Sequence, residues 1–270
     1  MIIGNRTFHV EENAYIMGIL NVTPDSFSDG GRWTDVDLAM ERVEQMIKEG
    51  ADIIDIGGES TRPGFEPVSD EEEIERVLPV VEKVKQCFDI PVSLDTSKSK
   101  VAAAGIRAGV DLINDIWGLK NDPELATLIG DAGIACCLMH NRHKKTYDNL
   151  LEDIIDDLDE TMDIAFWAGI RPDRIIVDPG IGFAKTTEEN LIILNQLERF
   201  SKWNVPVLLG TSRKSVIGNT LNLPVDQRLE GTLATTVLGR MKGASFFRVH
   251  DVKENKRALM MAEAILKAGK

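Results

Sequence analysis

The sequence predicts an α/β fold, a (β/α)8 TIM barrel with a short N-terminal β-hairpin. About eight times along the chain, a short apolar run ends in one or two polar or glycine residues and is followed by a helical stretch. The length of 270 residues is close to that of one such barrel. Because no linker rich in Pro, Gly or Ser and no abrupt change in charge divides the chain, we expect a single domain over residues 1–270.

The expected strands share one feature, a polar or glycine residue directly after the apolar run. They are 16–20 before Asn21, 53–56 before Gly57, 91–94 before Asp95, 112–113 before Asn114 and Asp115, 134–139 before His140, 175–177 before Asp178, 205–209 before Gly210, and 246–249 before His250. Since the C-terminal ends of barrel strands and the loops after them form the active site, we expect these residues to face one cavity. The first dozen residues do not fit the alternation and predict a small hairpin that plugs the bottom of the barrel.

Stretches of helical length follow the expected strands. Thr34, Ser69, Ser97 and Thr187 precede four of them and can accept a hydrogen bond from the first-turn amides. Acidic residues between 152 and 163, Asp157 among them, alternate with apolar ones and are interpreted as the solvent-facing side of an amphipathic helix. The expected helices span residues 36–49, 70–87, 98–108, 123–131, 149–168, 187–200, 228–242 and 252–267.

Composition excludes several classes of partner. The formal net charge of −13 argues against nucleic acid and anionic membrane surfaces, which require clustered Lys and Arg. No apolar stretch approaches about 18 residues, so no membrane span is expected. Three cysteines without a CxxC pair or a signal peptide fit the reducing cytoplasm. Cys136 and Cys137 are adjacent in an expected strand, so one should line the barrel and the other pack outward, both as core residues.

One group of strand-end residues carries carboxylates and an amide: Asp95, Asn114, Asp115 and Asp178. Carboxylates and amides suit a flat heterocycle edged with N–H donors and carbonyl acceptors, such as a pterin or a purine. A single Asp after a strand is weak evidence, because it is often a helix N-cap. Ser97 can take the capping role near Asp95, which leaves Asp95 freer to point inward.

A second group is cationic. Arg248 and His250 lie two apart on a strand, so both are expected to project toward the mouth. Together with Thr61 and Arg62 they could hold a diphosphate by charge-assisted, bidentate hydrogen bonds. Isolated surface arginines are the alternative, but several cations at strand ends of an acidic protein favour an anion site.

Other motifs are less specific. The polar loop 25–31 suits closure over a ligand, although it is equally consistent with a simple connection. His140 and His143 follow the fifth expected strand, and a two-histidine metal site there would need a third ligand, so loop roles are preferred.

The chain closely resembles the bacterial dihydropteroate synthase family of pterin-binding enzymes. The resemblance runs through seven motifs in order along nearly the whole chain. They are MGILNVTPDSFSDGG (17–31), DIGGESTRPG (55–64), SLDT (93–96), INDI (113–116), DPGIGF (178–183), GTSRKS (210–215) and RVHDV (248–252).

The resemblance implies a transferase of folate biosynthesis. The implied reaction condenses (7,8-dihydropterin-6-yl)methyl diphosphate with p-aminobenzoate to give 7,8-dihydropteroate and diphosphate. Mg²⁺ would assist departure of the diphosphate, and the aniline amine would then attack without any protein nucleophile. The family further implies a cytoplasmic homodimer.

Site residues are implied position by position. The pterin pocket would be lined by Asp95, Asn114, Asp178 and Lys214, with walls from Met139, Gly182 and Phe183. The diphosphate would be held by Thr61, Arg62, Arg248 and His250, and by Asn21 through Mg²⁺. The p-aminobenzoate would be surrounded by Phe27, Pro63, Lys214 and Ser215, and the catalytic groups would be Asp95, Lys214 and Asp29.

Two other functions are weighed against this one. A corrinoid-linked methyltetrahydrofolate methyltransferase domain has a similar barrel and pterin edge but no use for the diphosphate cradle of Arg62, Lys214 and Arg248. A catalytically silent pterin-binding protein would tolerate loss of the first loop, where Asp25, Phe27 and Asp29 are all present. Both observations favour the synthase.

Overall fold

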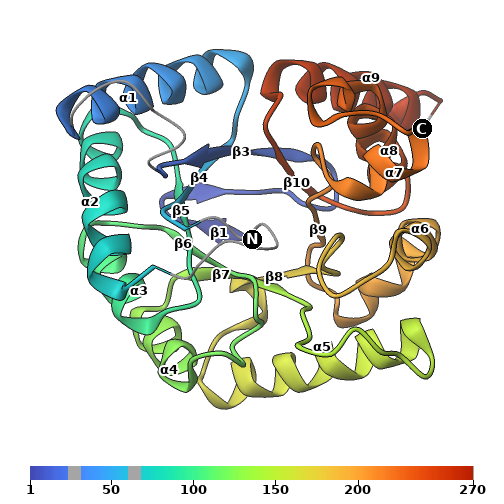
Figure 1. The fold of residues 1–270 in the computed structure, drawn as a ribbon, viewed down its shortest axis with the longest axis horizontal. Coiled ribbons are helices and arrows are strands. Elements are labelled where there is room, and N and C mark those ends of the chain that lie inside the picture. The colour runs from blue at the N-terminus through green and yellow to red at the C-terminus, as the bar shows by residue number, and fades with distance from the viewer. Residues whose placement is uncertain (24–31, 60–67, 270) are drawn as a thin grey trace.

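A computed structural model describes residues 1–23, 32–59 and 68–269, without the side chains of 32–35. Within these ranges, eight parallel strands form one sheet in the order β8-β7-β6-β5-β4-β3-β10-β9. A parallel bridge between Val177 and Val207 joins the two edges of the sheet, so the strands close into a barrel. Helices surround the ring of strands (Figure 1). The predicted (β/α)8 barrel is confirmed.

The strands agree closely with the apolar runs in the sequence. The barrel strands are β3 (Tyr15–Asn21), β4 (Ile53–Gly57), β5 (Val92–Asp95), β6 (Leu112–Asp115), β7 (Ala135–Met139), β8 (Ile175–Asp178), β9 (Leu208–Leu209) and β10 (Phe246–Val249). The helices are α1 (Arg32–Glu49), α2 (Asp70–Cys87), α3 (Ser99–Arg107), α4 (Pro123–Ala132), α5 (Leu150–Trp167), α6 (Thr187–Asn195), α7 (Ser215–Leu221), α8 (Leu229–Met241) and α9 (Val252–Lys267). The described residues also include three 3₁₀ segments, η2 (Pro172–Arg174), η3 (Leu197–Trp203) and η4 (Val225–Gln227). The predicted helix 187–200 is therefore two elements, α6 and η3.

Side chains alternate between the barrel interior and the helix layer, as strand geometry requires. One apolar cluster fills the lower interior and includes Met17, Ile53 and Phe246. A second, larger cluster includes Ile54 and Val177 and packs the outer faces of the strands against the helices. The two adjacent cysteines obey the same rule, since Cys136 belongs to the outer cluster and Cys137 to the inner one, as predicted.

The N-terminal hairpin closes the bottom of the barrel. Strand β1 (Ile2–Ile3) pairs antiparallel with β2 (Arg6–Thr7), and the N-terminus lies at the centre of the ring of strands in Figure 1. Ile3 and Phe8 are buried in the inner cluster. The ring of Phe8 lies 4.7 Å from that of Tyr15 and 5.7 Å from that of Phe246, centroid to centroid. The predicted plug is therefore confirmed.

Helix starts differ from the prediction in three places. Ser69 caps α2 by accepting from the amide of Glu72, as expected. Thr186, and not Thr187, caps α6, in a capping box with Glu189. Helix α3 starts at Ser99, whose amide donates to Asp122 Oδ2, whereas the Ser97 side chain hydrogen-bonds Asp115.

Thr34 lies inside α1, among the residues whose side chains are outside the described part of the structure. The predicted cap there is wrong, because the helix already begins at Arg32.

Helix α5 carries the predicted acidic face, except where Arg142 of the loop after β7 binds Asp153 and Asp157. Ile154, Ile155 and Leu158 are buried, while Asp156 and Glu160 are exposed. Asp157 is half-buried and bonds to the loop after β7, so its assignment to the solvent-facing side is wrong. Among the described helices, none combines the length and apolar character needed to cross a membrane.

Candidate active site

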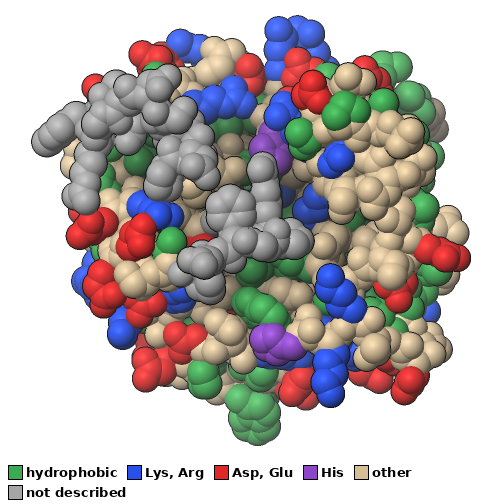
Figure 2. Space-filling model, in the orientation of Figure 1, with side chains coloured by type: hydrophobic (Ala, Val, Ile, Leu, Met, Phe, Trp, Pro, Cys, Tyr) green, Lys and Arg blue, Asp and Glu red, His purple; other side chains and the backbone are tan. Residues whose placement is uncertain are grey.

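The mouth of the barrel is lined by the last inward-facing residues of the strands. Strand alternation that places Ile53, Leu112 and Ile176 in the lower interior brings polar residues inward two positions later. These polar residues are Asp55, Asn114 and Asp178, joined by Asp95 from β5 and Arg248 from β10. Figure 2 shows Lys, Arg and His side chains near the centre of one face, with acidic side chains mainly around its edge.

Arg248 lies between two carboxylates. Its Nε is 2.6 Å from Asp55 Oδ2, and its Nη2 is 2.6 Å from Asp95 Oδ2. Asp55 also accepts from Ser93 Oγ at 2.5 Å and from Asn114 Nδ2 at 3.3 Å. Burial raises the pKa of Asp95 to about 7, against the lowering effect of the Arg248 guanidinium. The ion pairs therefore hold a cation and two carboxylates in fixed positions inside the mouth.

Asp178, at the end of β8, is held in place by the loop that follows it. Its Oδ1 accepts from the amide of Gly180 at 2.7 Å, and burial raises its pKa although Lys214 and the Gly180 amide act in the other direction. Gly210 keeps the space beside it open, since a Cβ there would lie 3.7 Å from Asp178 Oδ2 and 3.8 Å from Lys214 Nζ. Asp178 and Lys214 thus border the same space.

Lys214 directly precedes α7 and reaches back over the loop that follows β8. Its Nζ donates to Ile181 O at 2.5 Å and lies 4.6 Å from the centroid of the Phe183 ring, a cation–π contact. Gly182 has φ +87°, and a Cβ there would lie 3.1 Å from Lys214 Cδ. Burial lowers the pKa of Lys214 to about 8, while Asp178 opposes this shift. The ammonium and the aromatic ring form one wall of the mouth.

Asn21 ends β3 beside Gly57 and Asp95. A Cβ at Gly57 would lie 3.6 Å from Asp95 Oδ2 and 3.9 Å from Asn21 Oδ1, so both oxygens border the space that the glycine leaves free. Mg²⁺ prefers oxygen ligands and is often bound by one or two protein groups together with substrate phosphates. In the described part of the chain, no group of three His, Cys, Asp or Glu residues could hold a metal ion. The residues fit Mg²⁺ that arrives with a phosphorylated ligand.

The remaining predicted residues lie around this centre. Met139 is buried at the end of β7, in step with the inward-facing Cys137. His250 follows β10, where its Nδ1 lies 3.0 Å from Ser212 Oγ. Ser215 is exposed at the first position of α7, next to Lys214. The structure therefore brings Met139 and Lys214 to the mouth and leaves Ser215 and His250 at its rim.

Several predicted site residues lie outside the described residues. These are Asp25, Phe27, Asp29, Thr61, Arg62 and Pro63. Their proposed roles stay predictions.

Asp115 does not face the mouth, and the prediction that it does is wrong. Asn114 points inward, so strand alternation turns its neighbour outward. The carboxylate of Asp115 accepts from the amides of Trp117 at 2.9 Å and Leu119 at 2.6 Å. Leu119 has φ +67°, so Asp115 stabilises a tight turn after β6.

Sequence reasoning missed two residues of the site, Asp55 and Ser93. Asp55 is fully buried yet ion-paired to Arg248, and Ser93 donates to it. Their signal in the sequence is a polar residue within an apolar strand, at an even spacing from an inward-facing neighbour such as Ile53.

Comparisons with known proteins agree with the geometry. The model of the family described as "Pterin binding enzyme" matches residues 17–250. The dihydropteroate synthase of Clostridium beijerinckii is 58% identical over 99% of this chain and 100% of its own, and that of Bacillus subtilis is 51% identical over 96% and 91%. A crystal structure of dihydropteroate synthase from Clostridium difficile in the presence of pteroic acid has a TM-score of 0.94 at 47% identity, covering 96% of this chain and 99% of that one. With its barrel, its polar mouth and a match over most of its length, the chain belongs to the pterin binding enzyme family.

Proposed function

We propose that this chain condenses (7,8-dihydropterin-6-yl)methyl diphosphate with p-aminobenzoate, giving 7,8-dihydropteroate and diphosphate. It is a transferase of folate biosynthesis, as its relatives at 58% and 51% identity are dihydropteroate synthases. The observation that carries the proposal is one mouth that combines three hydrogen-bonding groups, Asp95, Asn114 and Asp178, with two cations, Lys214 and Arg248. A pterin diphosphate offers N–H donors, acceptors and negative charge to match this set.

The pterin would be recognised along its polar edge. A carboxylate such as Asp178 can accept two hydrogen bonds from the adjacent N–H groups of the pterin. Asn114 donates through Nδ2 to Asp55, which leaves its Oδ1 as an acceptor toward the ligand. Met139 and Phe183 would supply apolar contacts to the flat ring system.

The diphosphate would lie toward Arg248 and Asn21. Arg248 has five N–H donors, and the two short contacts with Asp55 and Asp95 use only part of this capacity. Mg²⁺, when bound with the diphosphate and Asn21, supplies positive charge that lowers the cost of the leaving group's negative charge. His250 and the residues Thr61 and Arg62 would complete the anion site.

Bond breaking and bond making then follow without a protein nucleophile. The methylene C–O bond breaks with its electron pair on the diphosphate, and the methylene cation is stabilised by the pterin. Asp95, held in place by Arg248, is buried, and a carboxylate in a site with little water would favour this positive charge. The amine of p-aminobenzoate forms the C–N bond and loses a proton to water or to the released diphosphate. Lys214 and Ser215 would border its carboxylate, and Phe27, Pro63 and Asp29 would complete the site.

Diphosphate release tests the proposal. Purified protein would be incubated with the pterin diphosphate and Mg²⁺, with and without p-aminobenzoate, and dihydropteroate would be detected by chromatography. We expect stoichiometric diphosphate and dihydropteroate with wild type and with Asp173→Asn, a change in the exposed segment η2, and a large loss with Asp95→Asn. Tight pterin binding with neither product would refute the synthase and favour a silent binder. Methyl transfer from methyltetrahydrofolate to a corrinoid would favour the methyltransferase.

The protein is further proposed to form a homodimer through α8 and α9. These two helices pack against each other and expose large apolar side chains. Leu238 and Met241 are 39% and 64% exposed, and Met261 and Ile265 are 62% and 63% exposed. Exposed apolar patches of this kind are typical of protein interfaces. Sedimentation should give a dimer for wild type and a monomer for Met241→Glu/Ile265→Glu, and a monomeric wild type would refute the dimer.

We also propose a cytoplasmic location. All three cysteines are free, and two of them are buried, which suits a reducing compartment.

A further inference from the structure

A chain of polar side chains lies behind the proposed pterin pocket and connects three segments of the barrel. His140 follows β7, Asp157 lies on α5, and Lys185 lies in the loop between β8 and α6. His140 Nε2 is 2.9 Å from Asp157 Oδ2, and His140 Nδ1 is 2.9 Å from Lys185 Nζ. His140 and Lys185 are 2% and 9% exposed. The proposed reaction uses none of the three.

The contacts of Lys185 define the direction of each hydrogen bond. Its Nζ lies 2.9 Å from His140 Nδ1 and 3.0 Å from each of the backbone oxygens of Gly180 and Phe183. An ammonium has three N–H donors and no acceptor, so these three acceptors use all of its donors. A neutral amine would instead have to accept a hydrogen bond from His140 Nδ1, which would place the positive charge on the imidazole. His140 Nδ1 therefore accepts, and its Nε2–H donates to Asp157.

Burial lowers the pKa of Lys185 to about 7, although Asp178 opposes the shift, and this value lies above the pKa of its neighbour His140, so the proton between them stays on Lys185. Burial lowers the pKa of His140 to about 4, although Asp157 opposes the shift, so the imidazole is neutral near pH 7. Burial alone would raise the pKa of Asp157, but hydrogen bonds from His140 and Arg142 hold it below its usual range. The Asp157 carboxylate is thus ionised and faces Lys185 through the neutral ring of His140.

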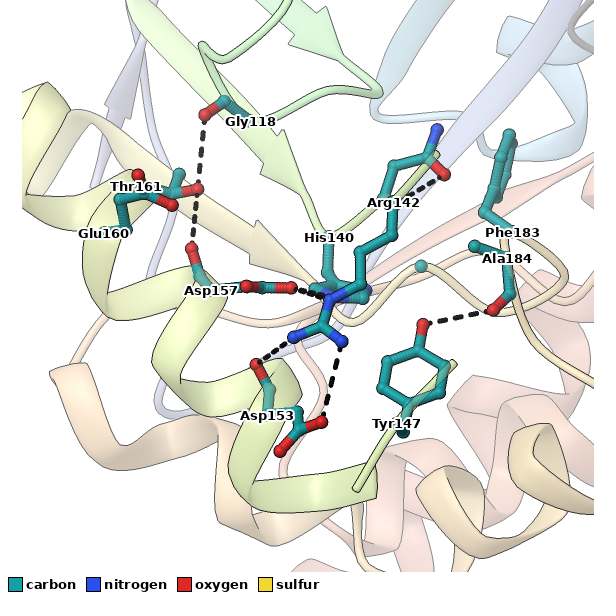
Figure 3. Close-up of polar contacts among 12 residues, drawn as sticks. Gly118, His140, Arg142, Tyr147, Asp153, Asp157, Glu160, Thr161, Phe183 and Ala184 are labelled. Carbon is teal, nitrogen blue, oxygen red and sulfur yellow. Dashed lines mark hydrogen bonds and ion pairs between the residues drawn. The ribbon is translucent and has the colours of Figure 1, made fainter. Parts of the chain in front are cut away.

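A second anchor holds the Asp157 end of the network. Figure 3 shows Arg142 reaching from the loop after β7 to Asp157 and Asp153 on α5. The Arg142 guanidinium also lies 4.8 Å from the centroid of the Tyr147 ring, and Tyr147 OH donates to Ala184 O at 3.1 Å. The loop after β7 is therefore hydrogen-bonded to the loop after β8 at two points, through His140 and through Tyr147.

The loop after β8 has three residues with positive φ. Gly180 and Gly182 have φ +74° and +87°, and Ala184 has φ +49°, a conformation that costs energy for a residue with a Cβ. A Cβ at Gly180 would lie 2.0 Å from His140 O, so the two loops touch directly. The same loop carries Phe183, which packs under the Lys214 ammonium in the mouth. Lys185 binds the backbone oxygens of Gly180 and Phe183 in this loop, whereas Lys214 binds Ile181 O and contacts the Phe183 ring.

We infer that Lys185, oriented by the His140–Asp157 pair, is a positioning residue for pterin binding. It fixes the backbone between Gly180 and Phe183, and thereby the aromatic wall and the Asp178 carboxylate that accepts from the Gly180 amide. The inference rests on the proposed function, because it assigns Phe183 and Asp178 to the pterin site. Residues that support metal ligands change affinity or activity by about 10- to 100-fold when removed, and we expect an effect of similar size for this support of the pterin site.

Lys185→Met tests the inference, because it keeps the length of the side chain and removes the three hydrogen bonds. The probe is 6-hydroxymethylpterin, titrated by calorimetry, with steady-state kinetics for both substrates. We expect the Kd of the probe and the KM of the pterin diphosphate to rise about tenfold or more, with a much smaller change in the KM of p-aminobenzoate. A folded Lys185→Met protein with wild-type affinity for the probe overturns the inference.

Lys120→Met is the matched control. Lys120 contacts the α5 end of the network, donating to Asp157 O at 2.8 Å and pairing with Glu160 at 2.6 Å, but it comes from the loop after β6, and within the described residues its ammonium makes no hydrogen bond or ion pair with the loop after β8. We expect its removal to leave the affinity for the probe unchanged. An equal loss of affinity in both variants would show that general damage to α5 is responsible and would overturn the specific role of Lys185.

A second pair of variants covers the case in which Lys185→Met fails to fold. His140→Asn keeps an oxygen acceptor for Lys185, whereas His140→Leu removes it. We expect the asparagine variant to bind the probe at least about tenfold more tightly than the leucine variant. Equal affinities would overturn the inference. Failure of the proposed function looks different: wild type would then bind no pterin or release no diphosphate, whatever the variants do.

Discussion

Arg248 and Asp95 form an ion pair inside the barrel mouth, with 2.6 Å between Nη2 and Oδ2, and the same guanidinium binds Asp55 through Nε. Asp55 is fully buried and Asp95 nearly so. One cation therefore compensates two carboxylates in a region with little water. Arg248 therefore stabilises two buried carboxylates and also belongs to the proposed active site.

Removal of the cation should be costly. We expect Arg248→Ala to lower the free energy of unfolding by about 3–5 kcal/mol, because it leaves buried carboxylates without their partner. Urea denaturation at pH 7.5 measures the change. The control is Arg171→Ala, since Arg171 pairs with Asp173 at 2.7 Å but is 73% exposed, and we expect it to cost less than about 1 kcal/mol. Similar losses in the two variants would contradict the prediction.

Substitutions of Asp178 and Asp115 should affect different properties, pterin affinity in the first case and thermal stability in the second. Asp178→Asn removes a carboxylate from the mouth, so we expect the affinity for 6-hydroxymethylpterin to fall about 10- to 100-fold, as for the loss of a charge-assisted hydrogen-bond pair. Asp115→Asn weakens the turn that ends at Leu119, so we expect a lower melting temperature with little change in pterin affinity. Calorimetry and thermal unfolding give the two readouts. Unchanged pterin affinity in Asp178→Asn would refute its role in edge recognition.

The pH dependence should reflect Lys214. Burial lowers the pKa of this lysine to about 8, so the ammonium is present below that pH and is lost as the pH rises through it. If the charged form contacts the substrate, kcat/KM for the pterin diphosphate should decline above about pH 8, since this ratio reports groups of the free enzyme. Lys214→Gln should be less active and should lack this decline. The same decline in both proteins would assign it to another group.

The N-terminal plug should matter for stability alone. Phe8 is 3% exposed and packs against Tyr15 and Phe246 at the end of the barrel away from the mouth. We expect Phe8→Ala to cost about 3–5 kcal/mol of unfolding free energy, with pterin affinity unchanged in the folded protein. Ile2→Ala, at a site that is 41% exposed, is the control and should cost much less. Loss of pterin binding in a folded Phe8→Ala protein would contradict the assignment.

The strand ends in the sequence predicted part of the site, and the family resemblance supplied the rest of the predicted residues. Asn114 and Asp178 were predicted at strand ends, and both face the mouth because they lie two residues after an inward apolar side chain. Asp115 was predicted there too, but it is one residue out of step and points into the helix layer. The wrong prediction for Asp115 shows that a position at a strand end does not by itself predict an inward-facing side chain. The residue must also lie an even number of positions from an inward-facing neighbour.

The periodicity of α5 correctly predicted which apolar side chains are buried, but it did not predict the contacts of Asp157. The acidic run on α5 does alternate with buried Ile154, Ile155 and Leu158. Asp157 looked like its exposed neighbours in the sequence, yet it lies on the flank of the helix against the loop after β7. Periodicity assigns a residue to one side of a helix, whereas the neighbours of a flanking position depend on the loops packed beside it.

The sequence by itself determined the barrel, the inner and outer apolar clusters, the N-terminal plug and the family, because these follow from local periodicity and from motifs of consecutive residues. Only the tertiary structure decided that Arg248 binds Asp55 and Asp95, and that Asp157, His140 and Lys185 form one network. These partners come from different strands, a helix and separate loops. Their distances depend on how the barrel closes and on how its loops pack, which no local pattern in the chain specifies.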